Sequence, residues 1–112
     1  MLCVNEIRRL IILDKRIKFD ESYVSEEYGT ITLYFIAPKD LFDGIDEGAE
    51  SVEISIECPK EYISAKYASV EYSPTKYDEE EEGYTDYDWR DIDLPYEEIE
   101  ALIKLAEESG RM

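Results

Sequence analysis

The strictest pattern in this sequence is an alternation of apolar and polar side chains over residues 51–58. The apolar positions are Val52, Ile54, Ile56 and Cys58, and the polar positions are Ser51, Glu53, Ser55 and Glu57. Because successive side chains of a β-strand point to opposite faces, this pattern predicts an antiparallel strand with one face on a hydrophobic core and the other in water. The rest of the chain must then supply neighbouring strands and a second apolar layer.

Neighbouring strands are predicted on both sides of this segment. Residues 30–37 alternate in the same way, and Pro38 ends the strand because proline cannot donate to the hydrogen-bond ladder. Residues 63–73 predict a further strand that forms a hairpin with residues 51–58. Between these strands, residues 39–50 predict a loop that contains a short helical turn.

The second apolar layer is predicted to be a C-terminal helix. Pro95 is suited to its first position and Gly110 to its end, and acidic residues occupy its early turns. Apolar side chains recur at helical spacing and form one stripe, which we expect to lie against the sheet. The stripe consists of Tyr96, Ile99, Leu102, Ile103 and Ala106.

Residues 4–19 are compatible with two structures. Their apolar residues fit one face of a helix, whereas the pair Ile11 and Ile12 favours a strand. We favour an extended segment, because Ile17 and Phe19 alternate with basic residues. The bases are interpreted as counter-charges for acids within the fold, and they are Arg8, Arg9, Arg16 and Lys18.

These elements predict the fold class and the domain organisation. The 112 residues suffice for one hydrophobic core without disulfide or metal cross-links. We expect a single α+β domain over residues 1–112, with an antiparallel sheet of four to five strands and one C-terminal helix packed on one face. Within this domain, we predict a flexible acidic loop at about residues 76–86.

Acidic residues dominate the charge of the chain. The formal net charge is −17, well beyond the magnitude of about 2 to 8 that suits a small soluble domain. The stretch 77–93 carries nine acidic residues, one base and four aromatic residues. Such a field repels nucleic acids and anionic membranes, and it attracts basic protein surfaces and cations.

The chain lacks the residues that several kinds of catalytic and binding site require. The sequence has no histidine, which removes histidine-dependent catalytic triads and histidine zinc sites. Two cysteines do not complete a structural zinc set, and the glycines form neither a dinucleotide-binding motif nor a P-loop. Asn5 is the sole asparagine and glutamine is absent, so direct reading of DNA bases is not expected. We predict neither an enzyme nor a cofactor nor a metal site.

A calcium loop is the alternative that requires the closest comparison. Acids at Asp78, Glu80, Glu82 and Asp86 coincide with positions 1, 3, 5 and 9 of the twelve-residue calcium loop. Position 12 is Trp89, where the loop needs a bidentate glutamate, and no helix is predicted before the stretch. Weak association of cations with a charged loop is the simpler interpretation.

The function expected from these features is binding to a basic protein. Carboxylates can occupy the lysine and arginine contacts that a nucleic-acid backbone would fill, and aromatic side chains supply interface area. We expect a small inhibitor of a basic nucleic-acid-binding protein or nuclease, of the kind that phages direct against CRISPR or restriction enzymes. The predicted partner-binding residues are Asp78, Glu79, Glu80, Glu81, Glu82, Tyr84, Asp86, Tyr87, Asp88 and Asp91.

Two alternatives to the inhibitor hypothesis remain open. One is an immunity protein that neutralises a toxin. The other is an acidic globular domain without mimicry, whose charges only solvate its surface or weakly attract calcium. Free cysteines, the lack of a secretion signal and the lack of a long apolar stretch predict a cytoplasmic protein without a membrane partner.

Overall fold

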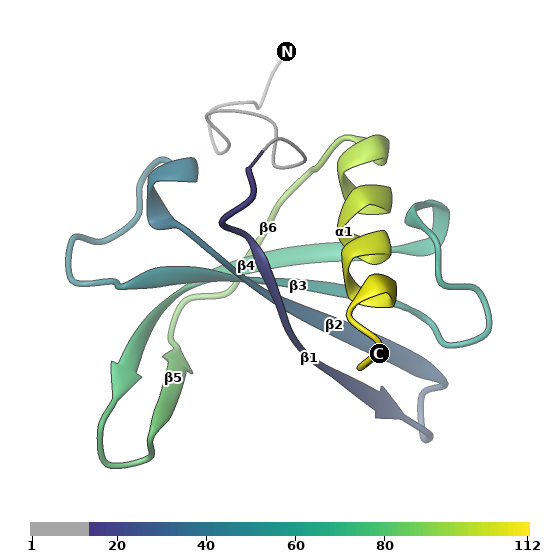
Figure 1. Cartoon of the computed structure of the whole chain (residues 1–112), viewed down its shortest axis with the longest axis horizontal. Coiled ribbons are helices and arrows are strands. Elements are labelled where there is room, and N and C mark those ends of the chain that lie inside the picture. Colours follow the sequence, from purple (N-terminus) through teal and green to yellow (C-terminus); the bar gives the residue numbers. More distant parts are fainter. Residues whose placement is uncertain (1–13) are drawn as a thin grey trace.

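The computed structural model describes residues 14–112, which form a six-stranded sheet and one α-helix (Figure 1). The strands are β1 (Lys18–Ser25), β2 (Thr30–Ala37), β3 (Ser51–Pro59), β4 (Ser69–Asp78), β5 (Gly83–Asp86) and β6 (Arg90–Asp91). The helix is α1 (Tyr96–Glu108), and two short 3-10 helices are η3 (Lys39–Leu41) and η4 (Ala65–Tyr67). The predicted α+β class is confirmed.

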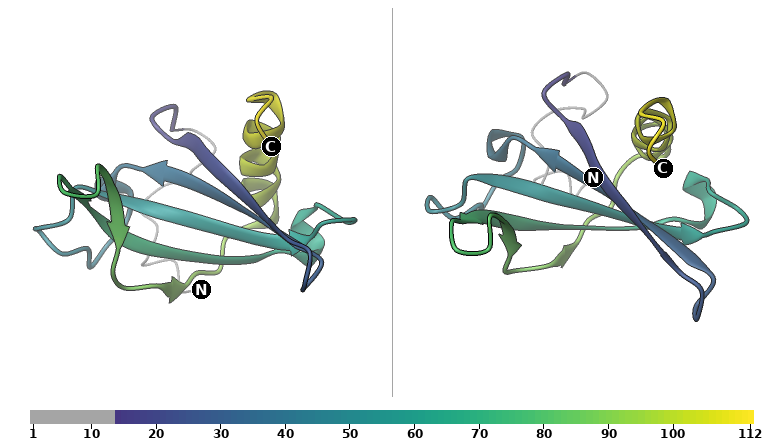
Figure 2. Two further views of the ribbon diagram at one scale, coloured as in Figure 1. Left: turned by 90° about the horizontal axis from the view of Figure 1, so that it is seen from below. Right: turned by 60° about the horizontal axis from the view of Figure 1, so that its bottom comes forward.

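All strand pairs in the sheet are antiparallel. The order is β1-β2-β3-β4-β5, and β6 pairs with a second part of β4. The sheet is curled, and α1 stands on one of its faces, as the two views of Figure 2 show. Consecutive strands are neighbours, so short turns suffice to connect β1 with β2 and β4 with β5.

The hydrophobic core lies between one face of the sheet and α1. Alternate residues of β2 and β3 point into it, and each is at most 5% exposed; they are Ile31, Leu33, Phe35, Ala37, Val52, Ile54, Ile56 and Cys58. Phe19 packs edge-on against Phe35, with ring centroids 5.6 Å apart. The alternation predicted for both strands is confirmed, and it defines an outer face that points away from α1.

The C-terminal helix contributes four of the five predicted apolar positions. Its buried residues include Ile99, Leu102, Ile103 and Ala106. Tyr96 is 54% exposed, so its predicted place in the stripe is wrong. The segment before the helix instead inserts Ile92 and Leu94 into the core.

The helix ends differ slightly from the prediction. Pro95 precedes the helix with extended backbone (φ −58°, ψ 149°) instead of occupying its first turn. Gly110 follows the helix with φ +74°, the left-handed conformation that glycine adopts without strain.

The third predicted strand is displaced along the chain. Residues 65–67 form η4, and β4 begins only at Ser69 and continues through Pro74 to Asp78. Residues 76–78 and 83–86 consequently belong to the hairpin of β4 and β5, and the turn is confined to residues 79–82. The carboxylate of Asp78 organises this turn, because it accepts hydrogen bonds from the backbone N–H groups of Glu80 (2.9 Å) and Glu81 (3.4 Å). Flexibility of the hairpin stays a prediction.

The N-terminal prediction is confirmed where the structure describes it. Ile17 and Phe19 are buried, and the intervening Lys18 is exposed. The guanidinium of Arg16 forms ion pairs with Asp14 (2.8 Å) and Asp40 (3.1 Å), which is the predicted counter-charge role. The remainder of the segment, with Arg8 and Arg9, lies outside the described residues.

Candidate binding site on the outer face of the sheet

The outer face of the sheet carries a row of cross-strand neighbours that runs through five strands. In antiparallel strands, directly opposed residues point to the same side. The register pairs Glu21 of β1 with Tyr34, Tyr34 with Ser55, Ser55 with Glu71, and Glu71 with Asp91 of β6. Together with carboxylates beside this row, these residues form what we call the acidic face, whose acids are Glu21, Glu53, Glu57, Glu71, Asp86 and Asp91.

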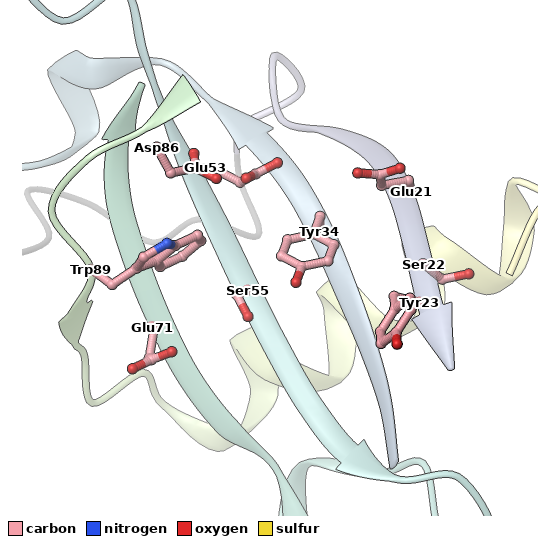
Figure 3. Close-up of a pocket in the computed structure, with 9 residues that line it drawn as sticks. All are labelled: Glu21, Ser22, Tyr23, Tyr34, Glu53, Ser55, Glu71, Asp86 and Trp89. Carbon is pink, nitrogen blue, oxygen red and sulfur yellow. The ribbon is translucent and has the colours of Figure 1, made fainter. Parts of the chain in front are cut away.

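Two adjoining cavities open on the acidic face, and no lysine or arginine lines either of them. The first, here called the Trp89 cavity, has a volume of about 510 Å³, and its lining includes Glu21, Tyr34, Glu53, Ser55, Asp86 and Trp89. The second, the Asp91 cavity, has a volume of about 400 Å³, and its lining includes Tyr34, Ser55, Glu57, Glu71 and Asp91. Figure 3 shows the side chains of the first cavity converging on one side of the sheet.

Two acids of the Trp89 cavity form a carboxyl pair. Glu53 is only 7% exposed, and its side chain hydrogen-bonds to that of Asp86. Burial, this hydrogen bond and the charges of Asp86, Asp20 and Glu21 raise the pKa of Glu53 to about 9. At neutral pH, the carboxyl pair therefore holds one proton, which lies in the hydrogen bond between Glu53 and Asp86.

The predicted exposure of Glu53 and Ser55 is wrong, although both side chains point to the predicted face. Ser55 is only 8% exposed. Tyr34 lies opposite Ser55 on β2, and Trp89 lines the same cavity from the segment between β5 and β6. Together these aromatic side chains line a cleft at the centre of the acidic face, so this face is not uniformly exposed to water.

The negative potential of the cavity also acts on Tyr34. Burial raises the pKa of its phenol, and the carboxyl groups of Glu53 and Asp86 raise it further. The part of this shift that comes from the carboxyl groups is the part that also attracts a cation, because desolvation disfavours any charged group.

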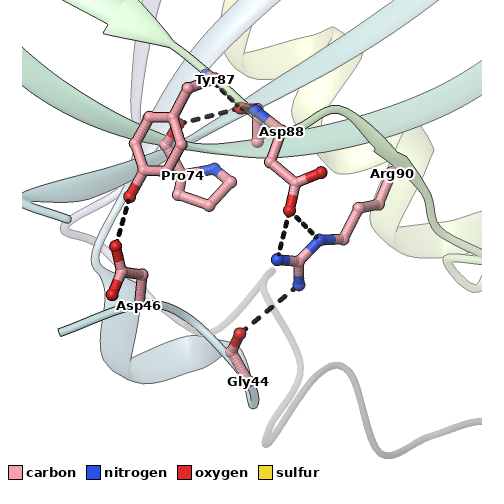
Figure 4. A network of polar contacts seen from close by, with 7 residues as sticks. Gly44, Asp46, Pro74, Tyr87, Asp88 and Arg90 are labelled. Carbon is pink, nitrogen blue, oxygen red and sulfur yellow. Dashed lines mark hydrogen bonds and ion pairs between the residues drawn. The ribbon is translucent and has the colours of Figure 1, made fainter. Parts of the chain in front are cut away.

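The position of Trp89 depends on an interruption of β4 at Pro74. Pro74 has no N–H, and the pairing of β4 changes there from β5 to β6. The hydroxyl of the fully buried Ser73 replaces the missing ladder contacts, because it accepts hydrogen bonds from the N–H groups of Tyr87 (3.2 Å) and Asp88 (3.0 Å). The segment between β5 and β6 is thus tied to the edge of β4 at Tyr87 and Asp88 (Figure 4).

Side-chain contacts hold the same segment from outside. The Tyr87 hydroxyl donates to Asp46 (3.3 Å), and the Arg90 guanidinium forms an ion pair with Asp88 (2.6 Å), as Figure 4 shows. The guanidinium carbon of Arg90 also lies 5.8 Å from the centroid of the Tyr72 ring. The single base of the acidic stretch is therefore used within the fold.

The predicted partner-binding residues fall into separate places. Asp86 and Asp91 lie on the acidic face, where the structure brings them together with four acids from other strands. The run from Asp78 to Glu82 occupies the turn between β4 and β5. The segment between β5 and β6 holds Tyr87 and Asp88 in the contacts described above, and the side chain of Tyr84 lies outside the described part of the structure.

The residues that sequence reasoning did not include in the site come from other strands, and they are Glu21, Tyr34, Glu53, Ser55, Glu57, Glu71 and Trp89. The polar positions of the alternating strand patterns predicted that several of these residues lie on one face of the sheet. It did not give the register that sets acids from β1, β3, β4 and β6 side by side.

The structure gives no support for a calcium loop. Within residues 14–112, no group of three or more histidine, cysteine, aspartate or glutamate side chains has an arrangement that could hold a metal ion. The carboxylate of Asp78, which would take the first position of that loop, is occupied by backbone N–H groups. No helix in the described residues is both long and apolar enough to span a membrane.

Comparisons with protein-family models, with curated proteins and with solved structures found no match to this chain.

Proposed function

We propose that this protein binds a basic surface of a nucleic-acid-binding protein or nuclease and inhibits it by occupying the sites of nucleic-acid phosphates. The observation that carries the proposal is the acidic face, with two adjoining cavities that carboxyl groups line and that have no lysine or arginine among the described residues of their lining. Arg16, Lys60 and Arg90 form ion pairs with acids that line neither cavity. Their positive charges therefore do not offset the carboxyl groups of the acidic face.

The dimensions of the sheet suit the contacts of such a partner. Adjacent strands are about 4.8 Å apart, and side chains on one face of a strand recur every 6.6 Å or so. Carboxylates on this grid can meet several lysine and arginine side chains at once, and the exposed ring of Trp89 (39%) offers a stacking surface. The turn at residues 79–82 adds long-range attraction without shaping the contact.

The proposal also includes the cellular compartment of the protein, the partners that it does not bind and its mode of action. Cys58 is a buried free thiol whose pKa is raised by burial, which suits the reducing cytoplasm. Nucleic acid and anionic membranes are not partners in this proposal, because the acidic face would repel both. The protein acts without a cofactor and without catalysis, by competitive occlusion.

The test is the capture of partners from a host lysate by two variants that remove the same formal charge. The face variant carries Glu57→Gln, Glu71→Gln and Asp91→Asn, and the turn variant carries Glu79→Gln, Glu80→Gln and Glu81→Gln. All six side chains are exposed, so both variants should fold. We expect one basic nucleic-acid-binding protein to be captured by the parent and the turn variant, released by added DNA or RNA, and lost with the face variant.

Other outcomes of the capture would redirect or reject the proposal. A partner lost with the turn variant alone would move the binding site to residues 79–82. Diffuse capture of basic proteins that both variants leave unchanged would reject binding through either surface. A toxic nuclease as the captured protein would identify an immunity protein, and a CRISPR or restriction enzyme would identify a phage-type inhibitor.

A further inference from the structure

We propose that the Trp89 cavity is a specific site for one guanidinium group, presented by an arginine side chain of the basic partner. This inference rests on the proposed function for the source of the arginine, but not for the chemistry of the cavity. The cation would lie between the carboxyl groups of Glu53 and Asp86, the hydroxyl of Ser55 and the rings of Tyr34 and Trp89, which Figure 3 shows around one opening.

Unused hydrogen-bonding capacity points to a ligand in this cavity. Ser55 is only 8% exposed, lines the cavity, and its hydroxyl has no hydrogen-bond partner among residues 14–112. The Oδ1 atom of Asp86 is also buried, and no described residue donates a hydrogen bond to it. Buried polar atoms are nearly always paired, so the buried Oδ1 atom of Asp86 indicates a donor that comes from outside the chain, and the hydroxyl of Ser55 offers that donor a second acceptor in the same lining.

The shape and composition of the cavity favour guanidinium over ammonium. A guanidinium group presents five N–H donors in one plane, which can serve two carboxyl groups and a hydroxyl together. Its flat faces stack on aromatic rings, and the cavity has such rings in Tyr34 and Trp89. Its weak hydration also lowers the cost of entering a partly buried site.

Binding of the cation should displace a proton. The carboxyl pair holds one proton at neutral pH, because the pKa of Glu53 is raised to about 9. The N–H groups of a bound guanidinium can take the place of this proton as hydrogen-bond donors to the two carboxyl groups. Its positive charge also lowers the pKa of Glu53, so the proton is released. The titratable groups that line the cavity with Glu53 or raise its pKa are acids and phenols, namely Asp20, Glu21, Tyr23, Tyr34, Glu71 and Asp86. One base, Lys18, lies on the same cross-strand row as Glu53, two strands away and beyond Ile36.

Calorimetry with N-acetyl-arginine amide as the probe tests the site on the whole protein. Titrations near neutral pH in two buffers with different ionisation enthalpies give the number of protons released. We expect saturable binding at one site, release of about one proton, and tighter binding as the pH rises from about 6 to about 8. The same titrations with an N-acetyl-lysine amide probe should show weaker binding, because ammonium lacks the planar donor set.

Two variants distinguish binding in the Trp89 cavity from attraction of the probe by the net negative charge of the protein. Glu53→Gln changes the charge of the protein little at neutral pH. It should nevertheless lower the affinity for the arginine probe about tenfold or more, and it should abolish proton release, because the amide side chain cannot ionise. Glu61→Gln removes a full charge from an exposed position outside both cavities, and it should leave affinity and proton release unchanged. Near-ultraviolet circular dichroism checks that Glu53→Gln keeps the fold.

The outcomes distinguish this inference from the proposed function. Absence of saturable binding by the parent, or equal affinities for the parent and Glu53→Gln, would overturn the guanidinium site even if a basic partner is captured. Probe binding with the expected proton release but without any captured protein would support the site and reject the proposed source. The ligand would then be a free guanidinium compound.

Discussion

At the scale of single residues, Glu53 sets the behaviour of the acidic face. Its pKa of about 9 in the folded protein lies above the ordinary glutamate value, so the folded state holds a proton that the unfolded state releases. For a group whose pKa is raised by folding, the stabilising contribution is fully present below the unfolded pKa and is lost as the pH rises through the folded pKa. Between about pH 4.5 and pH 9, Glu53 therefore makes the fold less stable as pH rises.

This residue yields a prediction whose sign differs from that of most substitutions. Glu53→Gln mimics the protonated side chain, so its free energy of unfolding should equal that of the parent near pH 4 and exceed it at pH 8. The difference should grow by up to about 1.4 kcal/mol per pH unit. Urea unfolding at several pH values measures it.

A neighbour on the same strand and face provides the control. Glu57 is exposed, so Glu57→Gln should show no such growth with pH. A Glu53→Gln protein that is less stable than the parent at every pH would show that Glu53 is ionised in the fold, and the carboxyl pair would then not hold a proton.

At the scale of elements, the change of pairing at Pro74 positions Trp89. The hydroxyl of Ser73 is buried and binds two backbone N–H groups, so Ser73→Ala would leave both without their acceptor. We expect a loss of about 1–3 kcal/mol in the free energy of unfolding, since a buried donor without a partner keeps its full desolvation cost. Because Trp89 is the sole tryptophan, its fluorescence should also shift to longer wavelength in the folded variant.

The matched control for this prediction lies on the same strand. Ser69 is exposed, and the structure assigns its hydroxyl no hydrogen bond to a described residue. Ser69→Ala should leave stability and fluorescence nearly unchanged. If Ser73→Ala behaved like Ser69→Ala, the path of the segment before Trp89 would have to be fixed by the contacts of Tyr87 and Arg90 alone.

At the scale of the whole molecule, the charge of −17 opposes folding through self-repulsion. Surface ion pairs such as Lys60 with Glu26 contribute little, so salt has more repulsion to screen than attraction. We expect the free energy of unfolding to rise, by on the order of 1 kcal/mol, as salt increases from about 0.05 M to about 0.5 M. Urea unfolding at both salt concentrations provides the measurement.

The turn between β4 and β5 offers a control for the salt effect. Replacing Glu79, Glu80 and Glu81 by glutamine removes three exposed charges, and the variant should gain less from salt than the parent. A fold that loses stability on addition of salt would show that attractive pairs outweigh the repulsion. For the captured partner, the opposite dependence is expected, since salt slows association between opposite charges.

The sequence determined the local structure wherever its apolar residues recur with the spacing of a strand or of a helix alone. Alternation in β2 and β3 set which side chains are buried, and the stripe of α1 set which face of the helix meets the sheet, because these periodicities follow from backbone geometry alone. It also determined the excess of negative charge and the absence of histidine chemistry. The beginning of β4 was misplaced, because residues 63–68 have a strand-like composition but form η4 and its flanks.

Only the tertiary structure decided where the candidate site lies. The sequence predicted partner-binding residues between Asp78 and Asp91, and of these only Asp86 and Asp91 are among the described residues that line the two cavities. The cavities arise from strands up to 70 residues apart in the chain, as Glu21 and Asp91 are. Burial of Glu53 depends on the register of four strands and on the turn that brings Trp89 over them. A local pattern states which face a side chain occupies, but only the packing of distant segments states which other side chains share that face and whether water reaches it.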